Sequence, residues 1–280
     1  MHKKEFRTNL MCQVVGVSRS GYYRWQRQKG LSKGNENQVL RQSIQRAFKD
    51  SRKSYGSPRI YRQLKSEGFT CGRHRIARLM QEDGIVARKR RQYKKPVSAE
   101  RGKPLASNIL NRQFQVNTKD RVWACDVSYF WTQTGWIHVA IVMDLYSRKI
   151  IGWSMNNRID KELTQDALEM AFTNRNPSTV IMHHSDQGQE YTNNDYQSLL
   201  KDHNMLVSMS RKANCYDNAV VESFFKTIKA ELARKSKFRT QEEAKLAIFE
   251  YIEIFYNRQR MHSTLGYMSP MEYERLNSVN

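Results

Sequence analysis

Three acidic residues stand in sequence contexts that could place them around one pair of metal ions. They are Asp126 in VWACDVSYF, Asp186 in HHSDQGQEYTN and Glu222 in NCYDNAVVESFFKTIK, with 59 and 35 residues between them. Asp126 lies in a β-branched and aromatic run, Asp186 ends an apolar run, and Glu222 lies in a segment of helical periodicity. Carboxylates from two strands and a helix can hold two divalent ions that align the attacking and leaving oxygens of a phosphodiester. Mg²⁺ suits such ligands because it is a hard cation that prefers oxygen, with Mn²⁺ as a substitute. The pattern predicts cleavage and joining of DNA strands.

The segment around Glu222 also predicts how its helix is oriented. Glu222, Lys226 and Lys229 fall at i, i+4 and i+7 and share one face. A carboxylate beside two ammonium groups suits a metal ligand next to a phosphate-binding edge, which assigns both lysines to DNA contact. An exposed Glu–Lys pair worth only about 0.2–0.5 kcal/mol is the alternative for this helix taken alone. The strand-end contexts of the other two acids favour the metal site. The apolar stripe that would pack on a sheet consists of Val221, Phe224, Phe225, Ile228 and Leu232.

Other polar residues near these acids have simpler interpretations. Asp144 also ends a strand-like run, but its neighbours indicate a turn, and an Asp that caps a turn is ordinary. Asp217 is predicted to cap the Glu222 helix. His183 and His184 are adjacent, so in a strand they point to opposite faces, which disfavours joint metal ligation. The strand context of Tyr129 predicts that it packs in the core.

Positive charge is concentrated in the first third of the chain. The 280 residues include 48 Lys and Arg against 27 Asp and Glu, a net charge of +21. Residues 1–104 hold 27 of these basic residues and 7 of the acidic ones, which indicates a nucleic-acid-binding region. A basic surface that serves only solubility would not explain why acidic residues are so scarce in this region. Charge alone leaves a ribosomal or membrane-surface role open. The four scattered cysteines favour a reducing cytoplasm, and no apolar stretch approaches the roughly 20 residues that span a bilayer.

The basic region divides into two parts. Residues 1–35 form a basic arm in which Gly16 supplies a turn and Ser18 caps a short helix; a helix-turn-helix fragment and a docking arm fit equally well. Residues 40–95 predict two helices around a short connector, as in a helix-turn-helix that lays its second helix in the major groove. A helical bundle with solvated arginines is the alternative, and the charge asymmetry favours DNA contact. The arginines assigned to that contact are Arg73, Arg75 and Arg78.

The remaining chain predicts a backbone-binding arm, a linker, an enzymatic core and a tail. Arg88, Lys89, Arg90 and Arg91 form the arm, which would add affinity rather than sequence readout. Residues 96–116 have the composition of a linker. Residues 117–235 begin with three strands in a meander and continue with alternating helices and strands, which indicates an α/β fold with a mixed sheet flanked by helices. Residues 236–280 form a helical tail that could bind DNA or brace the core.

At these motifs the chain resembles the OrfB-type transposases of the insertion-sequence-three family. The resemblance covers nearly the whole length, from GVSRSGYY and YGSPRIYRQL through the three acidic motifs to FYNRQRMHSTLGYMSPMEYE. It implies a ribonuclease-H-like core similar to retroviral integrase, preceded by a helical DNA-binding domain. It also implies that Asp126, Asp186 and Glu222 bind the metal and that Lys229 contacts the DNA end. The integrase-type zinc-binding His/Cys domain has no counterpart here, so no zinc is expected.

The resemblance carries expectations about activity and partners as well. It implies Mg²⁺-dependent cleavage and strand transfer at element ends, with double-stranded terminal repeats and target DNA as partners, in a bacterial, nucleoid-associated cytoplasmic protein. Self-association on DNA is expected because two ends must meet. Two alternatives stay open: a metal-dependent nuclease of the same fold, and an accessory or regulatory DNA-binding protein that needs an upstream reading frame, as a partner or by fusion, for activity.

Overall fold

The computed structural model describes residues 7–30, 33–87, 105–211, 214, 216–233 and 238–277. The chain divides into two compact units, residues 1–86 and 87–280. The predicted arm at Arg88–Arg91 lies outside the described residues. Within the described part of the chain, no helix combines the length and the apolar character needed to cross a membrane.

In the described part of the first unit, all the regular elements are helices. Its helices are α1 (Thr8–Val14), α2 (Arg19–Gly30), α3 (Lys33–Asp50), α4 (Ser57–Ser66) and α5 (Arg73–Glu82). Gly16 has φ +69° in the turn after α1, and the Ser18 hydroxyl accepts a hydrogen bond from the Gly21 amide at 3.0 Å, as the sequence predicts. Pro58 stands in the first turn of α4, where its missing amide hydrogen costs nothing. Gly68 and Gly84, at φ +90° and +63°, follow the ends of α4 and α5.

Helices α3, α4 and α5 enclose a small apolar core. Ile44, Ile60, Leu64, Ile76 and Leu79 are almost completely buried in it. Ion pairs on its surface join Arg41 to both Glu82 and Asp83, and Arg46 to Glu67. The two predicted helices of the helix-turn-helix-like region are therefore α4 and α5, packed on the long helix α3.

The second unit is built on one mixed sheet of five strands. The strands are β1 (Val122–Thr132), β2 (Gly135–Asp144), β3 (Ile150–Asn156), β4 (Met182–Ser185) and β5 (Leu206–Met209). Their order across the sheet is β3-β2-β1-β4-β5. β1, β2 and β3 form an antiparallel meander, whereas β4 runs parallel to both β1 and β5. The predicted meander followed by alternating helices and strands is confirmed.

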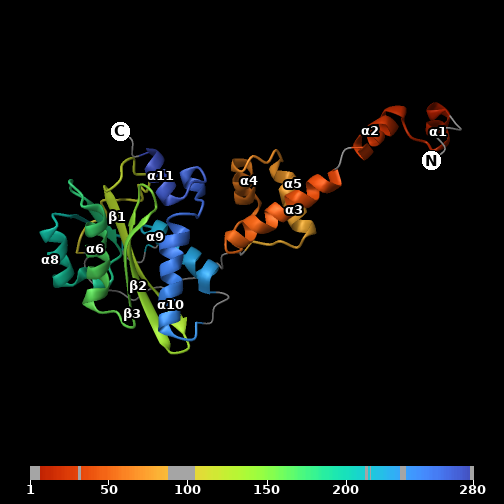
Figure 1. The fold of residues 1–280 in the computed structure, drawn as a ribbon. Coiled ribbons are helices and arrows are strands. Elements are labelled where there is room, and N and C mark those ends of the chain that lie inside the picture. The colour runs from red at the N-terminus through yellow and green to blue at the C-terminus, as the bar shows by residue number, and fades with distance from the viewer. Residues whose placement is uncertain are drawn as a thin grey trace. The chain divides into compact units, whose positions relative to one another are not determined.

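Helices cover both faces of this sheet (Figure 1). The first layer contains α6 (Lys161–Arg175), the single turn α7 (Gln189–Thr192) and α8 (Asn194–Asp202), and the second contains α9 (Ala219–Ile228) and α10 (Gln241–Phe249). Side chains of β1 alternate between the layers: Trp123 and Cys125 join the apolar cluster under α6 and α8, and Val122 and Ala124 join the one under α9 and α10. The buried residues of α9 include four members of its predicted apolar stripe, Val221, Phe224, Phe225 and Ile228.

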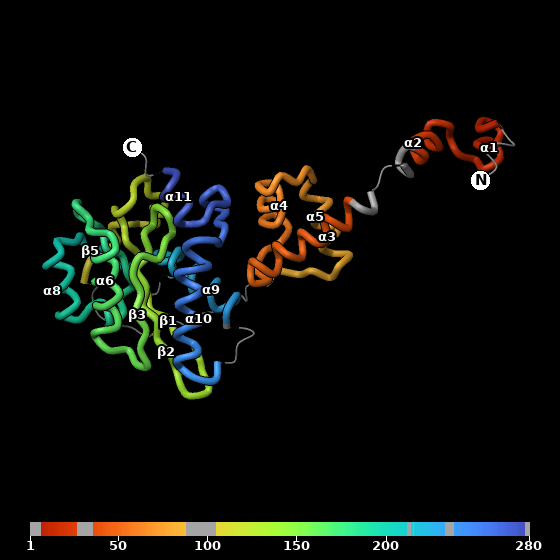
Figure 2. The backbone as a smooth tube through the Cα atoms, in the orientation of Figure 1, coloured from red at the N-terminus to blue at the C-terminus, as the bar shows by residue number. Residues whose placement is uncertain are grey.

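The C-terminal segment packs into the second of these clusters. It contains the π-helical turns η1 (Lys229–Ala233) and η2 (Glu250–Tyr256), the 3₁₀ turn η3 (Ser263–Leu265) and α11 (Pro270–Asn277). Ala244, Ile248 and Tyr251 are fully buried against the sheet layer, and Figure 2 shows α10 running alongside β1 and β2. Arg260, 2% exposed, pairs at 2.7 Å with the buried Glu231. This part of the tail therefore braces the core.

Candidate active site

The strand register brings the first two acidic residues to the same level of the sheet. Ala124 pairs with His184 across the parallel strands β1 and β4, and Asp126 and Asp186 each lie two residues further along. Ala124 packs toward α9, so alternation directs Asp126 to that same face. The Asp186 carboxylate, just beyond β4, accepts a hydrogen bond from the Gly188 amide at 2.9 Å, which leaves its other oxygen for a ligand.

Helix α9 brings the third carboxylate to this face. The Asn218 side-chain amide donates to the carbonyl of Cys125 at 2.9 Å and so ties the start of α9 to the strand residue beside Asp126. Glu222 follows one turn later and is 7% exposed. Its carboxylate pairs with the Lys226 ammonium at 3.1 Å. The predicted Glu–Lys pair thus exists, with its acidic member buried at the sheet.

Lys229 lies at the open edge of β1. Its ammonium is 4.6 Å from the centre of the Tyr129 ring and 5.6 Å from that of Phe130. Tyr129 and Phe130 point to opposite faces of the sheet, so a cation near both rings sits at the strand edge, past the end of β4. Burial lowers the pKa of Lys229, and the Asp126 carboxylate opposes this shift. Tyr129 is 53% exposed, so its predicted core role is wrong.

A buried hydrogen-bond network joins the strand that leads to Asp186 with the helix that carries Glu222. His184 donates from Nε2 to the carbonyl of Asp217 at 3.0 Å, and its Nδ1 lies 2.9 Å from the Ser208 hydroxyl. That hydroxyl accepts the amides of Ile109 and Leu110 at 3.0 and 3.1 Å. Burial lowers the pKa of His184 to about 4. The ring is therefore neutral at pH 7 and can donate on one side while it accepts on the other.

Asp217 does not cap the Glu222 helix, so that prediction is wrong. The N-cap is Asn218, without a side-chain capping bond. The Asp217 carboxylate is fully buried and is held instead by the guanidinium of Arg211 at 2.8 and 2.9 Å, that of Arg112 at 2.7 Å and the Arg211 amide at 3.0 Å. The Arg211 side chain is the main cause that holds the pKa of Asp217 well below its usual range. Charged hydrogen bonds across the loop before α9 outcompete a cap.

The other His and Asp residues considered from the sequence have structural roles. His183 points away from His184, as predicted, and its Nε2 lies 3.0 Å from the Tyr196 hydroxyl in the opposite layer. Burial lowers its pKa to about 3, so it is neutral. Asp144 is fully buried and accepts the amides of Asp120 and Tyr146 at 3.1 and 2.9 Å. This geometry confirms the turn role, and burial raises the pKa of Asp144 to about 7.

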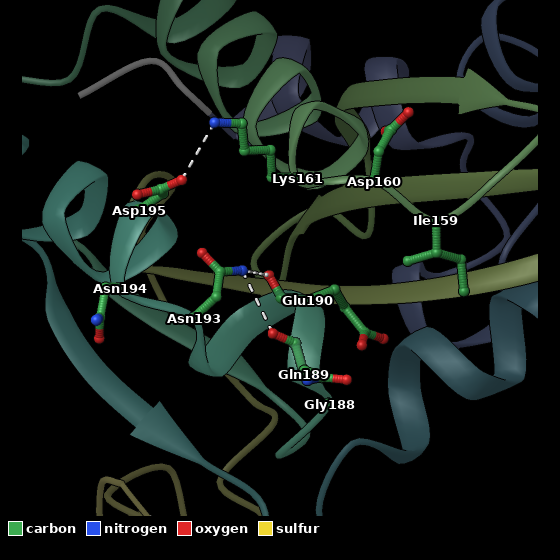
Figure 3. A pocket seen from close by; sticks show the side chains of 9 residues that line it. All are labelled: Ile159, Asp160, Lys161, Gly188, Gln189, Glu190, Asn193, Asn194 and Asp195. Carbon is green, nitrogen blue, oxygen red and sulfur yellow. Dashed lines mark hydrogen bonds and ion pairs between the residues drawn. The ribbon is translucent and has the colours of Figure 1, made fainter.

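A cavity of about 620 Å³ opens beside the loop that follows Asp186 (Figure 3). Its wall consists of residues 159–161, 188–190 and 193–195. Asn193 shapes it by donating to the carbonyls of Gln189 and Glu190 at 3.3 and 3.0 Å and by capping α8. Lys161 pairs with Asp195 at 3.4 Å across the wall. The wall is formed by the starts of α6 and α8 and by the segment two residues beyond Asp186, and none of the three candidate carboxylates lines the cavity.

The donor chemistry of the three acids fits Mg²⁺, although their side chains are not gathered. Among the described residues, no three His, Cys, Asp or Glu side chains form a group that could hold a metal ion. Glu222 is occupied by Lys226, and Asp186 is exposed. Oxygen donors on adjacent strands, Asp126 within β1 and Asp186 just beyond β4, with one on a facing helix, are nevertheless the ligands this cation accepts.

The arginines predicted to contact DNA differ in their availability. Arg73 and Arg78 are exposed on α5, and Arg78 forms a 3.5 Å pair with Glu82 one turn later. Arg75 turns inward and donates to the side chain of Asn37 at 2.8 and 3.1 Å and to Glu36 at 3.2 Å. The structure therefore gives Arg75 a tethering role between α5 and α3.

The functional-site residues that sequence reasoning missed are the members of the network behind the acids. Arg112 falls in the predicted linker, and the sequence predicts no role for Ser208 or Arg211. Arg112 lies 105 residues from Asp217, and Ser208 lies 24 from His184. No local pattern signals such pairs, because only the folded sheet brings them together.

Solved viral structures align with this chain at low similarity. A chain of the simian T-cell lymphotropic virus intasome in complex with PP2A regulatory subunit B56 gamma aligns with a TM-score of 0.47 and 12% identity, over 77% of this chain and 73% of that one. The HTLV-2 integrase catalytic core domain, solved in complex with magnesium, aligns with a TM-score of 0.37 and 11% identity, over 55% of this chain and 94% of that one.

Sequence relatives are much closer. Families described as integrase core domain match residues 117–215 and 222–277, and an HTH-like domain family matches residues 35–93. The insertion element IS600 uncharacterized 31 kDa protein of Shigella sonnei is 40% identical, over 94% of this chain and 97% of that protein. Transposase InsF for insertion sequence IS3A of Escherichia coli (strain K12) is 37% identical, over 99% of this chain and 96% of that protein. With an HTH-like domain before an integrase core, and relatives aligned along nearly its whole length, the chain belongs to the IS3 family of insertion-sequence transposases.

Proposed function

We propose that this chain cleaves the DNA ends of an insertion element and joins them to target DNA with Mg²⁺, through Asp126, Asp186 and Glu222. The observation that carries the proposal is the shared level of Asp126 and Asp186 on neighbouring strands, on the face where α9 presents Glu222. When bound between these carboxylates, paired Mg²⁺ ions would neutralise charge at the reacting phosphate and activate the attacking hydroxyl. The protein's own contribution is positioning and charge complementarity.

Each residue around the carboxylates has a place in this proposal. Lys226 neutralises Glu222 in the absence of metal, and metal binding would release its ammonium toward a DNA phosphate. Lys229, at the edge of β1 next to Asp126, would hold the end of the cleaved strand. The His184 and Asp217 network fixes the spacing between β4 and α9. The exposed arginines of α5 and the basic segment that follows it supply general affinity for duplex DNA.

The test uses labelled duplexes that carry the element's own ends, in Mg²⁺ or EDTA. Wild type should nick and join the ends only with Mg²⁺, and Glu222→Gln should lose both steps while it keeps DNA affinity and thermal stability. The matched control is Asp202→Asn, which replaces an exposed acid on α8 and should leave both steps unchanged. Joining that persists in Glu222→Gln would exclude Glu222 from the site.

Metal binding can be measured apart from catalysis. A cation that binds only the folded protein raises its unfolding temperature. Mg²⁺ should therefore stabilise wild type and Asp202→Asn, and should stabilise Asp126→Asn less. Cleavage without joining would favour the nuclease alternative. Tight DNA binding without chemistry at any Mg²⁺ concentration would favour the accessory role, and the fused product would then be assayed.

A further inference from the structure

Three large aromatic side chains are exposed together on the hairpin that β1 and β2 form. Tyr129 is 53% exposed, Trp131 59% and Trp136 44%. Trp131 and Trp136 are cross-strand partners with ring centres 4.8 Å apart, and Tyr129 lies 5.0 Å from Trp136 in a perpendicular arrangement. The three rings therefore form one continuous surface, here called the aromatic platform.

The backbone beneath this platform is rigidly held. Gly135 turns the hairpin at φ +125°, and the buried Thr132 hydroxyl donates to its carbonyl at 2.7 Å. The Gln133 amide donates to the carbonyl of Phe238 at 3.0 Å, and the Gln241 side chain donates to that of Trp136 at 3.2 Å. Exposed rings on a braced hairpin form a pre-organised surface, because little conformational entropy remains to be lost on binding.

The platform is continuous with the proposed catalytic edge. β4 ends at Ser185, at the level of Cys125, and among the described residues the next backbone pairing of β1 on that side is the bridge between Thr132 and Phe238. Lys229 occupies this open edge and contacts the Tyr129 ring. At roughly 3.3 Å per residue, Tyr129 lies about 10 Å along β1 from Asp126 and Trp131 about 17 Å. Tyr129 and Trp131 face the opposite side of the sheet from Asp126, so a DNA strand bound at Asp126 would pass around the strand edge at Lys229 to reach these rings.

The cation beside the platform suits a nucleic acid. No Asp or Glu occurs between Asp126 and Asp144, so the part of the hairpin that bears the three rings carries no acidic side chain. Lys229 stands at the strand edge beside the Tyr129 ring, and the segment that meets the turn carries the exposed Arg239 together with the exposed Glu242 and Glu243. A hydrophobic contact between two copies of the chain does not require a cation beside the rings. Bases that stack on aromatic rings do, because their phosphates then lie next to that cation.

We propose that Tyr129, Trp131 and Trp136 stack against unpaired nucleobases of the DNA end held at the proposed catalytic carboxylates. The inference rests on the proposed function for its ligand, an end whose terminal bases have separated. Stacking on the platform stabilises the separated bases and keeps the strand end aligned with Lys229 and Asp126. The aromatic rings contact the flat face of a base, so binding does not depend on which base it is.

The experiment compares two versions of an element-end duplex in EDTA, one fully paired and one with three unpaired terminal nucleotides that include 2-aminopurine. The full-length wild type should bind the unpaired end about tenfold more tightly, within the range that stacking of a base provides. It should also quench the 2-aminopurine fluorescence. Trp131→Ala and Trp136→Ala should each lose most of this preference and of the quenching, whereas Trp131→Phe should retain a large part.

The control is Phe249→Ala, which removes an equally exposed aromatic side chain, 40% exposed on α10, and should leave preference and quenching unchanged. Thermal unfolding shows that each variant is folded, as expected for exposed positions. Equal affinity of wild type for both ends, or full quenching in Trp131→Ala, would overturn the platform. Conversion of a dimer to a monomer by Trp131→Ala, with the preference intact, would overturn it in favour of self-association.

This result is separable from the test of the catalytic proposal. Binding and quenching are measured without metal, so neither depends on the catalytic step. If the wild type quenches the fluorescence but shows no Mg²⁺-dependent cleavage or joining, the stacking proposal is supported and the catalytic proposal is contradicted. If the wild type cleaves and joins DNA but does not quench the fluorescence at the unpaired end, the catalytic proposal is supported and the stacking proposal is contradicted.

Discussion

At the scale of single residues, Asp217 controls the position of α9 without touching the proposed metal site. Asp217→Asn keeps the size of the side chain but removes the charge that Arg112 and Arg211 neutralise. The start of α9 should shift, and because misplacement by about 1 Å can cost roughly 100-fold in rate, cleavage should fall by about 10- to 100-fold. DNA affinity should change little. A variant that cleaves as fast as wild type would remove Asp217 from the positioning network.

The same residue predicts a pH dependence of stability. The pKa of folded Asp217 lies below its unfolded value of about 3.9. Its stabilisation is therefore complete above pH 4 and is lost as the pH falls through the folded pKa. Wild type should exceed Asp217→Asn in unfolding temperature by a constant margin between pH 5 and 7, and the margin should shrink below pH 4. A margin that grows on acidification would contradict this sign.

At the scale of secondary structure, sequence patterns predicted the elements better than their lengths and neighbours. The β-branched runs located β1, β2 and β3, and the apolar stripe located α9, because each pattern reflects burial within one element. The exposure of Tyr129 depends instead on a difference between two strands. β4 has 4 residues and β1 has 11, so the end of β1 projects past its partner. Neither strand's own sequence contains that mismatch.

In the candidate site, too, some residues could be predicted from their local sequence and others could not. The three carboxylates were predicted from their local contexts, and their metal-binding role remains a prediction. The partners that position them were not predicted, because His184, Ser208 and Asp217 lie on three different elements whose contacts depend on the register of β4 and β5. A polar residue that is fully satisfied after folding looks the same in sequence as one that faces solvent.

Helix α6 packs so closely on β3 that a single methyl group should disrupt it. A Cβ atom at Gly152 would lie 2.0 Å from the carbonyl oxygen of Ala167 and 2.8 Å from the amide nitrogen of Ala171. Both are backbone atoms, so the helix itself must move. Gly152→Ala should lower the free energy of unfolding by about 3 kcal/mol, the upper part of the usual range for overpacking. Chemical denaturation would measure it, and a loss below 0.5 kcal/mol would contradict this packing.

A buried ion pair between Arg260 and Glu231 helps to fasten the tail to the core. Arg260 pairs with Glu231, whose carboxylate also accepts the Tyr251 hydroxyl at 2.7 Å. Arg260→Ala should lower the free energy of unfolding by about 3–5 kcal/mol, because it leaves Glu231 buried without its cation. The double variant Arg260→Met, Glu231→Leu should recover most of that loss. If Arg260→Ala instead weakened DNA binding with no loss of stability, the bracing role would be wrong.

At the scale of the whole molecule, the two units should divide affinity from chemistry. The first unit carries the exposed Arg73 and Arg78, and each phosphate contact contributes about 0.9 to the slope of log affinity against log salt. Removing both arginines should lower that slope by up to roughly 1.8. Cleavage at saturating DNA should stay unchanged, because the carboxylates and Lys229 belong to the second unit.

Arg75→Ala is the matched control on the same helix. Arg75 is bound to Asn37 and Glu36, so its loss should lower the stability of the first unit while the salt slope changes little. Filter-binding titrations from 50 to 200 mM salt, beside thermal unfolding of the full chain, separate the two effects. Equal slopes for Arg75→Ala and for the double variant would mean that α5 does not present Arg73 and Arg78 to DNA. The affinity would then have to come from cations elsewhere in the chain.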